Sequence, residues 1–475
     1  MTTARSLGVQ LPPQTTASGL LHELLREACD HFATLREVPV PPGAKAFRGT
    51  FGAVLPLFEA ARVSSPERSA VARRIALEAA GALVYRDAGG HETPLAGYLG
   101  DGRAEPLPLA VRRGSAAPGL PLAVPTKERI YRGPEVTDLV DALAAKNHIT
   151  PAAAEGLRWI VGASRSGLEL SSKKIVLLGA GAELAPTPIL LGAGAQVLWI
   201  DINEPNVDPS SFSGTLHYVE GGSDLLTQPK EILATIEAFA GDDPVWLGMF
   251  AYAAGGGREW RLEAAMNAIV RALPRERIAG LGLYISPTTA VSVLSADAEA
   301  AAQGREEAPL WQQLIRRAGG LRPSTTEPHD DRQVSRSLIP MQGTSYQATQ
   351  YVAKALVAEA FATSHRFGRV SANVAGITNT SSMSLPVFQA GFLGAPSFGV
   401  QIFEPATTRW LSGLLLAHDW THPETPSDDP AVLFSRQIHG GVYSMPFALD
   451  DALKYAAVIG FARKPQLLGQ MLRRR

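Results

Sequence analysis

The chain has 475 residues, of which 45% are hydrophobic and 19% are charged, and its formal net charge is -1. This composition excludes an intrinsically disordered protein, because disorder requires low hydrophobicity and a high net charge. The balanced charge also excludes a basic field that would hold nucleic acid. The length predicts roughly two or three domains.

Cys29 is the single cysteine, so an intramolecular disulfide and a cysteine zinc site are excluded. Its helical, apolar surroundings predict a buried structural thiol. We predict no metal site elsewhere, because His418 and His422 have helix-like spacing but Pro423 and a polar segment follow them.

No targeting or membrane segment is expected. Residues 1–16 lack the continuous apolar segment of a secretory signal, so we expect a cytoplasmic protein. The apolar run 175–200 contains four glycines, two prolines and Glu183, which would interrupt a membrane helix. It therefore predicts a buried strand, a turn, a helix and a second strand.

Residues 1–170 are predicted to form a separate, mostly helical domain. Within it, segment 89–125 is rich in Gly and Pro, which predicts turns, short strands or a long packed loop. Thr150 and Pro151 have the residue types of a helix cap and a first helical residue. Helical spacing of apolar residues predicts helices over 20–32, 65–83, 134–146 and 150–161.

From residue 171 onward, strands and helices alternate. The predicted strands are 173–180, 196–201, 216–221, 244–253, 278–286 and 368–375. The predicted helices between them are 182–193, 229–240, 258–273 and 343–365. Strands that are apolar on both faces and separated by helices predict an α/β fold with a doubly wound parallel sheet. Its ligand is expected at the carboxyl ends of the strands.

The turn after the first strand has a pattern typical of a dinucleotide site. Gly179, Gly181, Ala182 and Glu183 connect a strand to a helix, and Asp201 ends the second strand 20 residues after Gly181. Glycines allow the backbone to approach a pyrophosphate at the helix N-terminus. Asp201 would accept hydrogen bonds from a ribose diol and repel a 2′-phosphate, so the pattern predicts NAD rather than NADP.

Two features depart from that pattern. Leu184 or Ala185 stands where a third glycine is usual, and Glu183 places a negative charge beside the expected phosphates. A structural turn that has lost its nucleotide is therefore the alternative interpretation. Pro186 and Pro188 fit only in or near a first helical turn, so the following helix must begin late or be kinked.

Five motifs occur in an order that resembles the short-chain dehydrogenase/reductase superfamily. They are Gly221-Gly222-Ser223-Asp224-Leu225, Ala251-Tyr252-Ala253-Ala254-Gly255-Gly256, Tyr284-Ile285-Ser286, Gly343-Thr344-Ser345-Tyr346-Gln347-Ala348-Thr349-Gln350 and Asn373-Val374-Ala375-Gly376-Ile377-Thr378-Asn379-Thr380. The resemblance covers a little under half of the chain. It implies an SDR-like Rossmann domain over 171–475, with an insertion at about 288–340, and a homo-oligomer.

The resemblance also implies site residues. Tyr346 is at the position of the catalytic tyrosine and Ser286 at that of the catalytic serine, whereas Gln350 replaces the lysine. The implied cofactor contacts, besides the first turn and Asp201, are Asp224, Ala253, Ala254, Gly255, Gly376 and Thr378.

The chemistry can be stated from the residues themselves. Hydride transfer to a carbonyl leaves an alkoxide that Tyr346 could protonate, while Ser286 holds the substrate oxygen. Lys354, two helical turns after Tyr346, could supply a positive charge or bind the ribose. Tyr351 is a rival acid, and Thr288 or Thr289 could serve instead of Ser286.

These features predict an NAD(H)-dependent oxidoreductase acting on a hydroxyl/carbonyl pair or an enoyl bond. The apolar segment 384–403 predicts a hydrophobic small molecule or thioester as substrate. The insertion would cover that substrate, contact a partner subunit or form a mobile loop. The alternatives are a nucleotide-binding scaffold or sensor without hydride transfer, and an epimerase or lyase that uses bound NAD.

Overall fold

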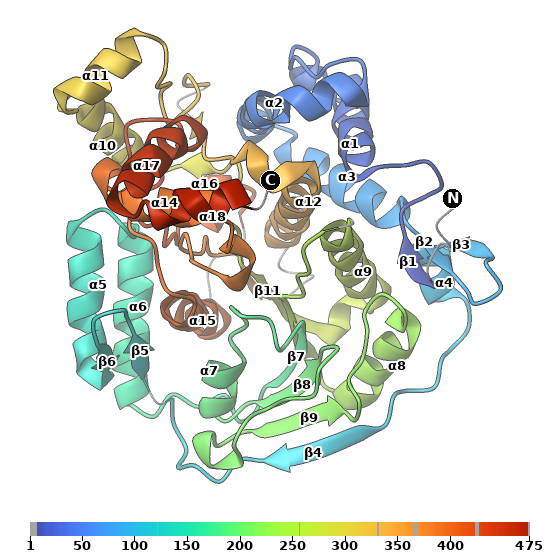
Figure 1. Cartoon of the computed structure of the whole chain (residues 1–475). Helices are drawn as coiled ribbons and strands as arrows, with labels where there is room; N and C mark the ends of the chain where they lie inside the picture. The colour runs from blue at the N-terminus through green and yellow to red at the C-terminus, as the bar shows by residue number, and fades with distance from the viewer. Residues whose placement is uncertain are drawn as a thin grey trace.

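A seven-stranded, mostly parallel sheet forms the centre of the molecule in the part of the chain that the structure describes (Figure 1). The structure is a computed structural model that describes residues 7–120, 122–255, 257–329, 332–363, 369–422 and 427–473. In sheet order the strands are β14 (Arg369–Ser371), β11 (Ile278–Leu283), β10 (Val245–Met249), β7 (Lys174–Leu178), β8 (Gln196–Ile200), β9 (Thr215–Val219) and β4 (Leu109–Arg113).

The order of the parallel strands is that of a doubly wound sheet. From β7 the chain builds outward through β8 to β9, then returns to the other side of β7 and builds outward through β10 and β11 to β14. The winding therefore reverses between β7 and β10, which is where ligands bind in such sheets. All six strands predicted from the sequence are confirmed, and the arrangement is compatible with a Rossmann-like fold.

Helices cover both faces of this sheet. Alternate strand residues point to opposite faces, so Val176 and Leu178 join one apolar cluster while Ile175 and Leu177 join the other. The first cluster includes α8 (Pro229–Ala240), α9 (Arg258–Ala272) and α12 (Gly343–Ala362). The second includes α7 (Thr187–Gly192), α15 (Pro405–Thr421) and α6 (Pro151–Arg165).

The helix after β7 begins late, as the two prolines predict. Its first helical residue is Thr187, with Pro186 at the cap position and Pro188 in the first turn. The run 175–200 is thus a strand, a turn, a short helix and a strand. In the described ranges, no helix is both long and apolar enough to cross a membrane.

The N-terminal segment packs on the sheet domain from two sides. Helices α1 (Ala17–His31), α2 (Ala44–Ser64) and α3 (Arg68–Gly81) join the cluster around α12 and α9. Helices α5 (Val136–Ala145) and α6 join the opposite cluster, and β4 pairs antiparallel with β9 at the edge of the sheet (Figure 1). The apolar side chains of this segment therefore share both cores with the sheet.

The predicted N-terminal helices are present, and the structure shows the cap at Thr150 and the burial of Cys29. Thr150 caps α6 by accepting a hydrogen bond from the Ala153 amide at 3.3 Å. Cys29 is buried on α1, and burial raises the pKa of its thiol to about 11, as expected for a structural residue. The smaller elements here are β1 (Gly8–Gln10), β2 (Val84–Arg86), β3 (Glu92–Pro94), α4 (Leu95–Gly100), β5 (Ala123–Pro125) and β6 (Ile130–Arg132).

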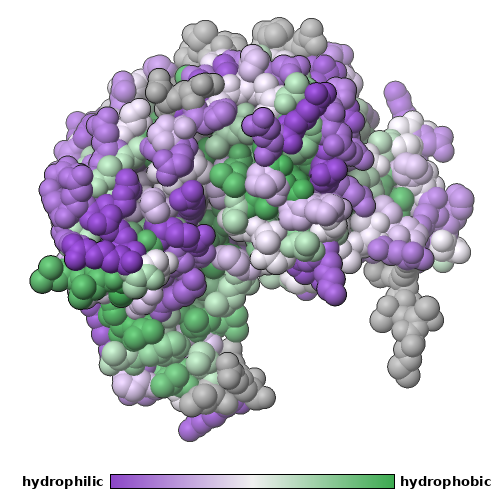
Figure 2. All heavy atoms as spheres, turned by 90° about the horizontal axis from the view of Figure 1, so that it is seen from above, coloured by the Kyte–Doolittle hydropathy of each residue, from purple (hydrophilic) through white to green (hydrophobic). Residues whose placement is uncertain are grey.

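The segment after β11 and the C-terminal part form a layer above the carboxyl ends of the strands (Figure 1). Its elements are β12 (Ser292–Val293), α10 (Ser295–Glu306), α11 (Leu310–Arg317), β13 (Gln333–Val334), α14 (Pro386–Gly394), α16 (Pro430–Leu433), α17 (Leu449–Arg463) and α18 (Gln466–Arg473). Helices α14 and α17 pack closely at Gly460. A Cβ at this position would lie 1.8 Å from the Ala390 oxygen, so the glycine permits the contact. Seen from above, the surface is mostly hydrophilic, with hydrophobic residues in separate patches (Figure 2).

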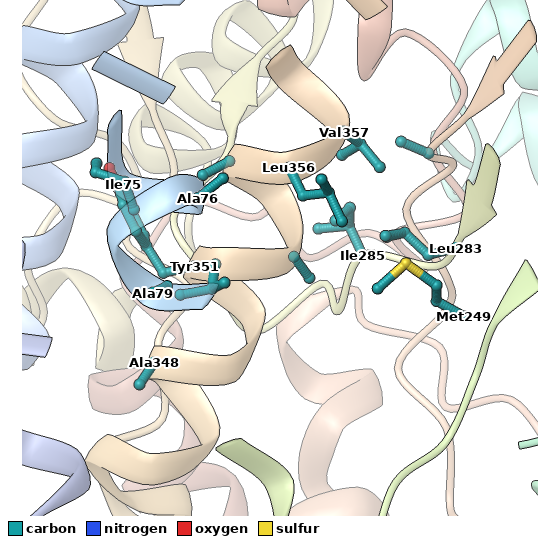
Figure 3. Packing of buried hydrophobic residues seen from close by; sticks show 14 of the residues in the cluster. Ile75, Ala76, Ala79, Met249, Leu283, Ile285, Ala348, Tyr351, Leu356 and Val357 are labelled. Carbon is teal, nitrogen blue, oxygen red and sulfur yellow. The ribbon is translucent and has the colours of Figure 1, made fainter. Parts of the chain in front are cut away.

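Helix α12 lies between α3 and the sheet. Figure 3 shows Tyr351 and Ala348 toward Ala76 and Ala79 of α3, while Leu356 lies on the side of the sheet residues. Small residues on α3 allow this close approach. The rotation of α12 about its axis decides which of its side chains face the carboxyl ends of the strands.

A buried charged cluster joins α12 to α2. Lys354 Nζ lies 2.9 Å from Glu59 Oε1, and both side chains are 1% exposed. Arg62 donates to both oxygens of Glu59 at 2.8 Å, and the Tyr351 hydroxyl donates to Glu59 Oε2 at 2.8 Å. Burial alone would raise the pKa of Glu59, but the charges of Arg62 and Lys354 lower it to about 2.

Breaking this cluster should destabilise the fold in a defined order. Glu59→Gln leaves two buried cations without their counter-charge, so we expect a loss of roughly 3–5 kcal/mol in the free energy of unfolding. Lys354→Met keeps the Glu59–Arg62 pair and should cost less. Urea denaturation of both variants checks this, and equal losses would contradict it.

Candidate functional site

A cavity of about 390 Å³ lies at the carboxyl ends of the central strands. Residues that follow β7, β10, β11 and β14 form its floor, and α9 and α12 form one wall. Apolar side chains of α14 and α17 contribute to the opposite side. The cavity therefore occupies the crevice where the winding of the sheet reverses.

Tyr346 and Ser286 meet in this cavity. The Tyr346 hydroxyl, on α12, donates to Ser286 Oγ, which follows β11, at 2.6 Å. Ser286 Oγ lies 2.9 Å from Thr288 Oγ1, and Thr288 Oγ1 donates to Gln342 Oε1 at 2.9 Å. Because Thr288 has a single hydroxyl hydrogen, Ser286 is the donor in their bond. The sequence predicted Tyr346 and Ser286 as partners, and the structure brings them together.

Burial keeps the Tyr346 hydroxyl in its neutral form. Burial raises the pKa of Tyr346, and the hydrogen bonds with Ser286 and Thr288 only partly oppose this. No Lys, Arg or His is among the described residues that line the cavity. Tyr346 is therefore arranged as a proton donor at neutral pH.

Gln350 holds Ser286 at the position where the resemblance implies a lysine. Its side-chain oxygen accepts a hydrogen bond from the Ser286 amide at 2.9 Å, and the residue lines the cavity. An amide cannot lower the pKa of a tyrosine as a cation would. Its contribution is to position Ser286.

Lys354 is not in the cavity, so the role expected for it beside Tyr346 is not supported. It lies in the buried cluster with Glu59 and also donates to the Ala290 carbonyl. Eight residues at about 100° each rotate Lys354 by roughly 80° from Tyr346 around the helix. The rival acid Tyr351 is on the same side, bonded to Glu59.

The turn after β7 lies directly against Asp201. Gly181 donates its amide to Asp201 Oδ2 at 3.0 Å, and Asn203 donates to Oδ1 at 3.1 Å. Gly179 has a φ of 86°, and a Cβ there would lie 2.2 Å from the Ala251 nitrogen. Glycine is required at 179 by this positive φ and this close contact.

The carboxylate of Glu183 bridges the turn to the segment after β14. Its Oε2 accepts from the amide and hydroxyl of Ser381 at 3.1 and 3.0 Å. Arg409 on α15 donates through Nε to the Glu183 carbonyl at 2.8 Å, which brings a positive charge to the turn. Ala182 and Glu183 both line the cavity.

The remaining predicted cofactor contacts divide into two groups. Gly376 and Thr378 line the cavity, and Thr378 Oγ1 bonds to the Gly376 carbonyl at 2.8 Å. Three of the others, Asp224, Ala253 and Gly255, are not among its described lining residues. Asp224 accepts from the Leu226 amide in its own turn, and Gly255 donates to Glu259.

Ala254 belongs to the same loop after β10 and also does not line the cavity. Its carbonyl accepts a hydrogen bond from Arg258 at 3.1 Å. The loop is thus tied to the start of α9. This group of predicted contacts has a structural explanation without a cofactor.

The turn and Asp201 fit the ribose end of a dinucleotide. A carboxylate has about four acceptor sites, and backbone amides use two of those on Asp201. A Cβ at Gly181 would lie 3.1 Å from Asp201 Oδ2, so the glycine leaves this edge of the carboxylate less crowded. The Gly181 amide donates to Asp201 and the Ala182 amide to the Gly179 carbonyl, so Asp201 and the amides of 183 and 184 are the groups that could hold such a ligand.

Glu263 is a cavity residue that sequence reasoning missed. It is on α9, is 6% exposed, and its Oε1 makes no hydrogen bond among the described residues. Burial alone raises the pKa of its carboxyl to about 8. The signal available was an acid with Trp260 and Met266 three residues to either side, which places it on an apolar helix face.

Tyr252 and Tyr284 also line the cavity without having been predicted as site residues. Tyr284 is partly buried, and its buried hydroxyl is unbonded among the described residues. Tyr252 packs edge-to-face against Tyr346, with ring centroids 6.2 Å apart. Both pKa values are raised by burial, so both hydroxyls are neutral donors.

No family model and no curated protein matches the chain. Among the described residues, no three His, Cys, Asp or Glu side chains are grouped to hold a metal ion. His418 and His422 stack with ring centroids 5.0 Å apart, and His418 Nδ1 bonds to Asp419. The chemistry of the cavity therefore has to be inferred from its own geometry.

Glu263 should make the fold less stable as pH rises. An unfolded glutamate ionises near pH 4.5 and the folded one near pH 8, so the native state binds more protons between these values. The free energy of unfolding should fall by roughly 1 kcal/mol per pH unit in this window relative to Glu263→Gln. Urea denaturation of both proteins at about pH 5, 6, 7 and 8 measures this difference. Parallel curves would contradict it.

Proposed function

We propose that this protein is an NAD(H)-dependent oxidoreductase of the short-chain dehydrogenase/reductase type. The observation that carries the proposal is the 2.6 Å hydrogen bond between Tyr346 and Ser286 in an apolar cavity at the carboxyl ends of the strands. The order of the strands and the contact between Gly181 and Asp201 support it. The substrate would contain a carbonyl or an enoyl bond.

The bound cofactor would supply a hydride to the substrate. Asp201 and the turn at Gly181 would hold its ribose end. The chain's own residues then manage the proton: the Tyr346 hydroxyl delivers it to the substrate oxygen that becomes negative. Because Tyr346 is neutral at neutral pH, it carries the proton that reduction of a carbonyl would consume.

Ser286 and its partners orient the hydroxyl of Tyr346, which accepts no hydrogen from Ser286 but donates to it. Gln350 fixes the Ser286 backbone, and Thr288 accepts the hydrogen of its hydroxyl. When a carbonyl oxygen enters, Tyr346 can turn its hydrogen from Ser286 to the ligand. Ser286 remains aligned by its bond to Thr288. The Tyr346 hydroxyl, which donates to the ligand, is therefore positioned before the reaction.

The cavity walls define an apolar substrate. Phe388, Phe392 and Phe398 contribute aromatic rings, and Met445 and Leu449 contribute flexible apolar surface. These side chains would bind a hydrocarbon or aromatic body and exclude water from the reacting carbonyl.

A second candidate function is dinucleotide binding without hydride transfer. The absence of Lys, Arg and His from the described cavity lining favours it, because no cation assists Tyr346. This candidate expects nucleotide binding with no product from any carbonyl or enoyl substrate.

The cofactor proposal predicts a preference that fluorescence titration can measure. NADH should bind more tightly than NADPH, because Asp201 repels a 2′-phosphate. Asp201→Asn should lower the ratio of NADH affinity to NADPH affinity by about tenfold or more, because it removes the negative charge. Equal binding of both dinucleotides by the unmodified protein would contradict the role of Asp201.

Tyr346→Phe should remove turnover while leaving NADH affinity nearly unchanged. We expect kcat to fall by at least about 100-fold, because general acid catalysis contributes that much. Tyr131→Phe, on β6 away from the cavity, is the matched control. Retained turnover in Tyr346→Phe would rule out its role as the acid.

A further inference from the structure

The cavity has an uneven distribution of charge. Two of its described lining residues, Glu183 and Glu263, are acids, and none is Lys, Arg or His. Glu183 already accepts two hydrogen bonds from Ser381 through one oxygen. An anionic ligand group beside Glu263 would therefore meet a carboxyl group with no Lys, Arg or His among the described lining residues to offset it.

Glu263 has no polar partner among the residues that the structure describes. It is 6% exposed, and no hydrogen bond or ion pair to it is present among the described residues. Glu259, one turn earlier on α9, differs: it accepts from the Gly255 amide at 2.9 Å and from Ser345 Oγ at 3.1 Å. A buried carboxyl without a partner costs stability, so its presence in a cavity indicates a ligand contact.

We propose that Glu263 forms a subsite for the ammonium group of an apolar amine substrate. This assignment rests on the proposed function, because it names the class of molecule that the cavity takes. An ammonium supplies a positive charge and three donors, which can satisfy the carboxyl oxygens. Aromatic side chains of the cavity, including Phe388 and Tyr252, add favourable surfaces for an organic cation.

A neutral ligand fits this position less well. Its carbonyl oxygen would accept one hydrogen bond from a protonated Glu263 and leave the other oxygen without a partner. The Tyr346 hydroxyl already provides a donor for such a group. The two polar positions of the cavity thus suit different parts of one substrate, a carbonyl at Tyr346 and an amine at Glu263.

Binding of an amine should release a proton near neutral pH. The carboxyl of Glu263 is protonated up to about pH 8, and burial alone causes this. On α12, packed against α9, Lys354 and Glu359 are paired with Glu59 and Arg271. The other titratable groups that line the cavity are Glu183, Tyr252, Tyr284 and Tyr346.

The test compares three probes of one shape by calorimetry: octylamine, octanol and octanoate. Octylamine should bind at least about tenfold more tightly than either other probe, because only it pairs with the carboxylate. The affinity for octylamine should rise from about pH 6 to about pH 8, because Glu263 must lose its proton to pair with the ammonium. That proton should appear in the buffer. A neutral contact would give the opposite trend.

Two variants make the result specific. Glu263→Gln should abolish the preference for octylamine and change octanol affinity less than about threefold, because it removes only the charge. Glu259→Gln, which alters a bonded carboxylate outside the cavity, should keep the preference. A preference that survives Glu263→Gln, or the failure of octylamine to bind, would overturn the subsite.

NADH titration of the same samples separates this proposal from the function above. Unchanged NADH binding with no preference for octylamine would reject the amine subsite alone. Loss of both would reject the cavity as a substrate site.

Discussion

The buried ion pair between Glu59 and Lys354 fixes the helix on which the candidate site depends. Because Lys354 is bound to α2, the rotation of α12 about its axis is set. Tyr346, roughly 80° from Lys354 around the helix, and Gln350 then face the cavity at the carboxyl ends of the strands. A charged contact outside the cavity lining thus helps to decide which hydroxyl lies next to Ser286.

The parallel sheet could be predicted because each strand is a short, fully apolar run between helices. Helix α8 was predicted with its observed bounds, since Pro229 begins it and Gly241 follows it. Helix α2 was missed because Gly49, Gly52 and Pro56 are helix breakers in isolation, and packing against α1 and α3 overrides them. The edge strand β4 depends on a non-local pairing with β9.

The candidate site was only partly predictable, for a similar reason. The order of the motifs predicted Tyr346, Ser286 and the turn at Gly181 as parts of one site. Ser286 and the turn each follow a strand, and Tyr346 lies in the first turn of the helix before the last strand. The location of Lys354 depends on Glu59, almost 300 residues earlier, so helical spacing alone could not place it. Glu263 was missed because an acid within an apolar helix face resembles any other helix residue in the sequence.

Buried polar groups are treated differently in two parts of the structure: they are paired around Glu59, and some are unpaired in the cavity. Around Glu59, every charge has a partner, whereas in the cavity Glu263 and the Tyr284 hydroxyl lack one among the described residues. Unpaired buried groups reduce stability and are retained where a ligand completes them. This contrast is the reason why we propose the cavity, and not the charged cluster, as the functional site.

The most direct test of the account is a crystal structure of the protein with NADH. The account predicts a dinucleotide that runs from Asp201 across the turn at Gly181, with its nicotinamide in the cavity beside Tyr346 and Ser286. A dinucleotide bound elsewhere, or no bound dinucleotide at saturating NADH, would contradict it.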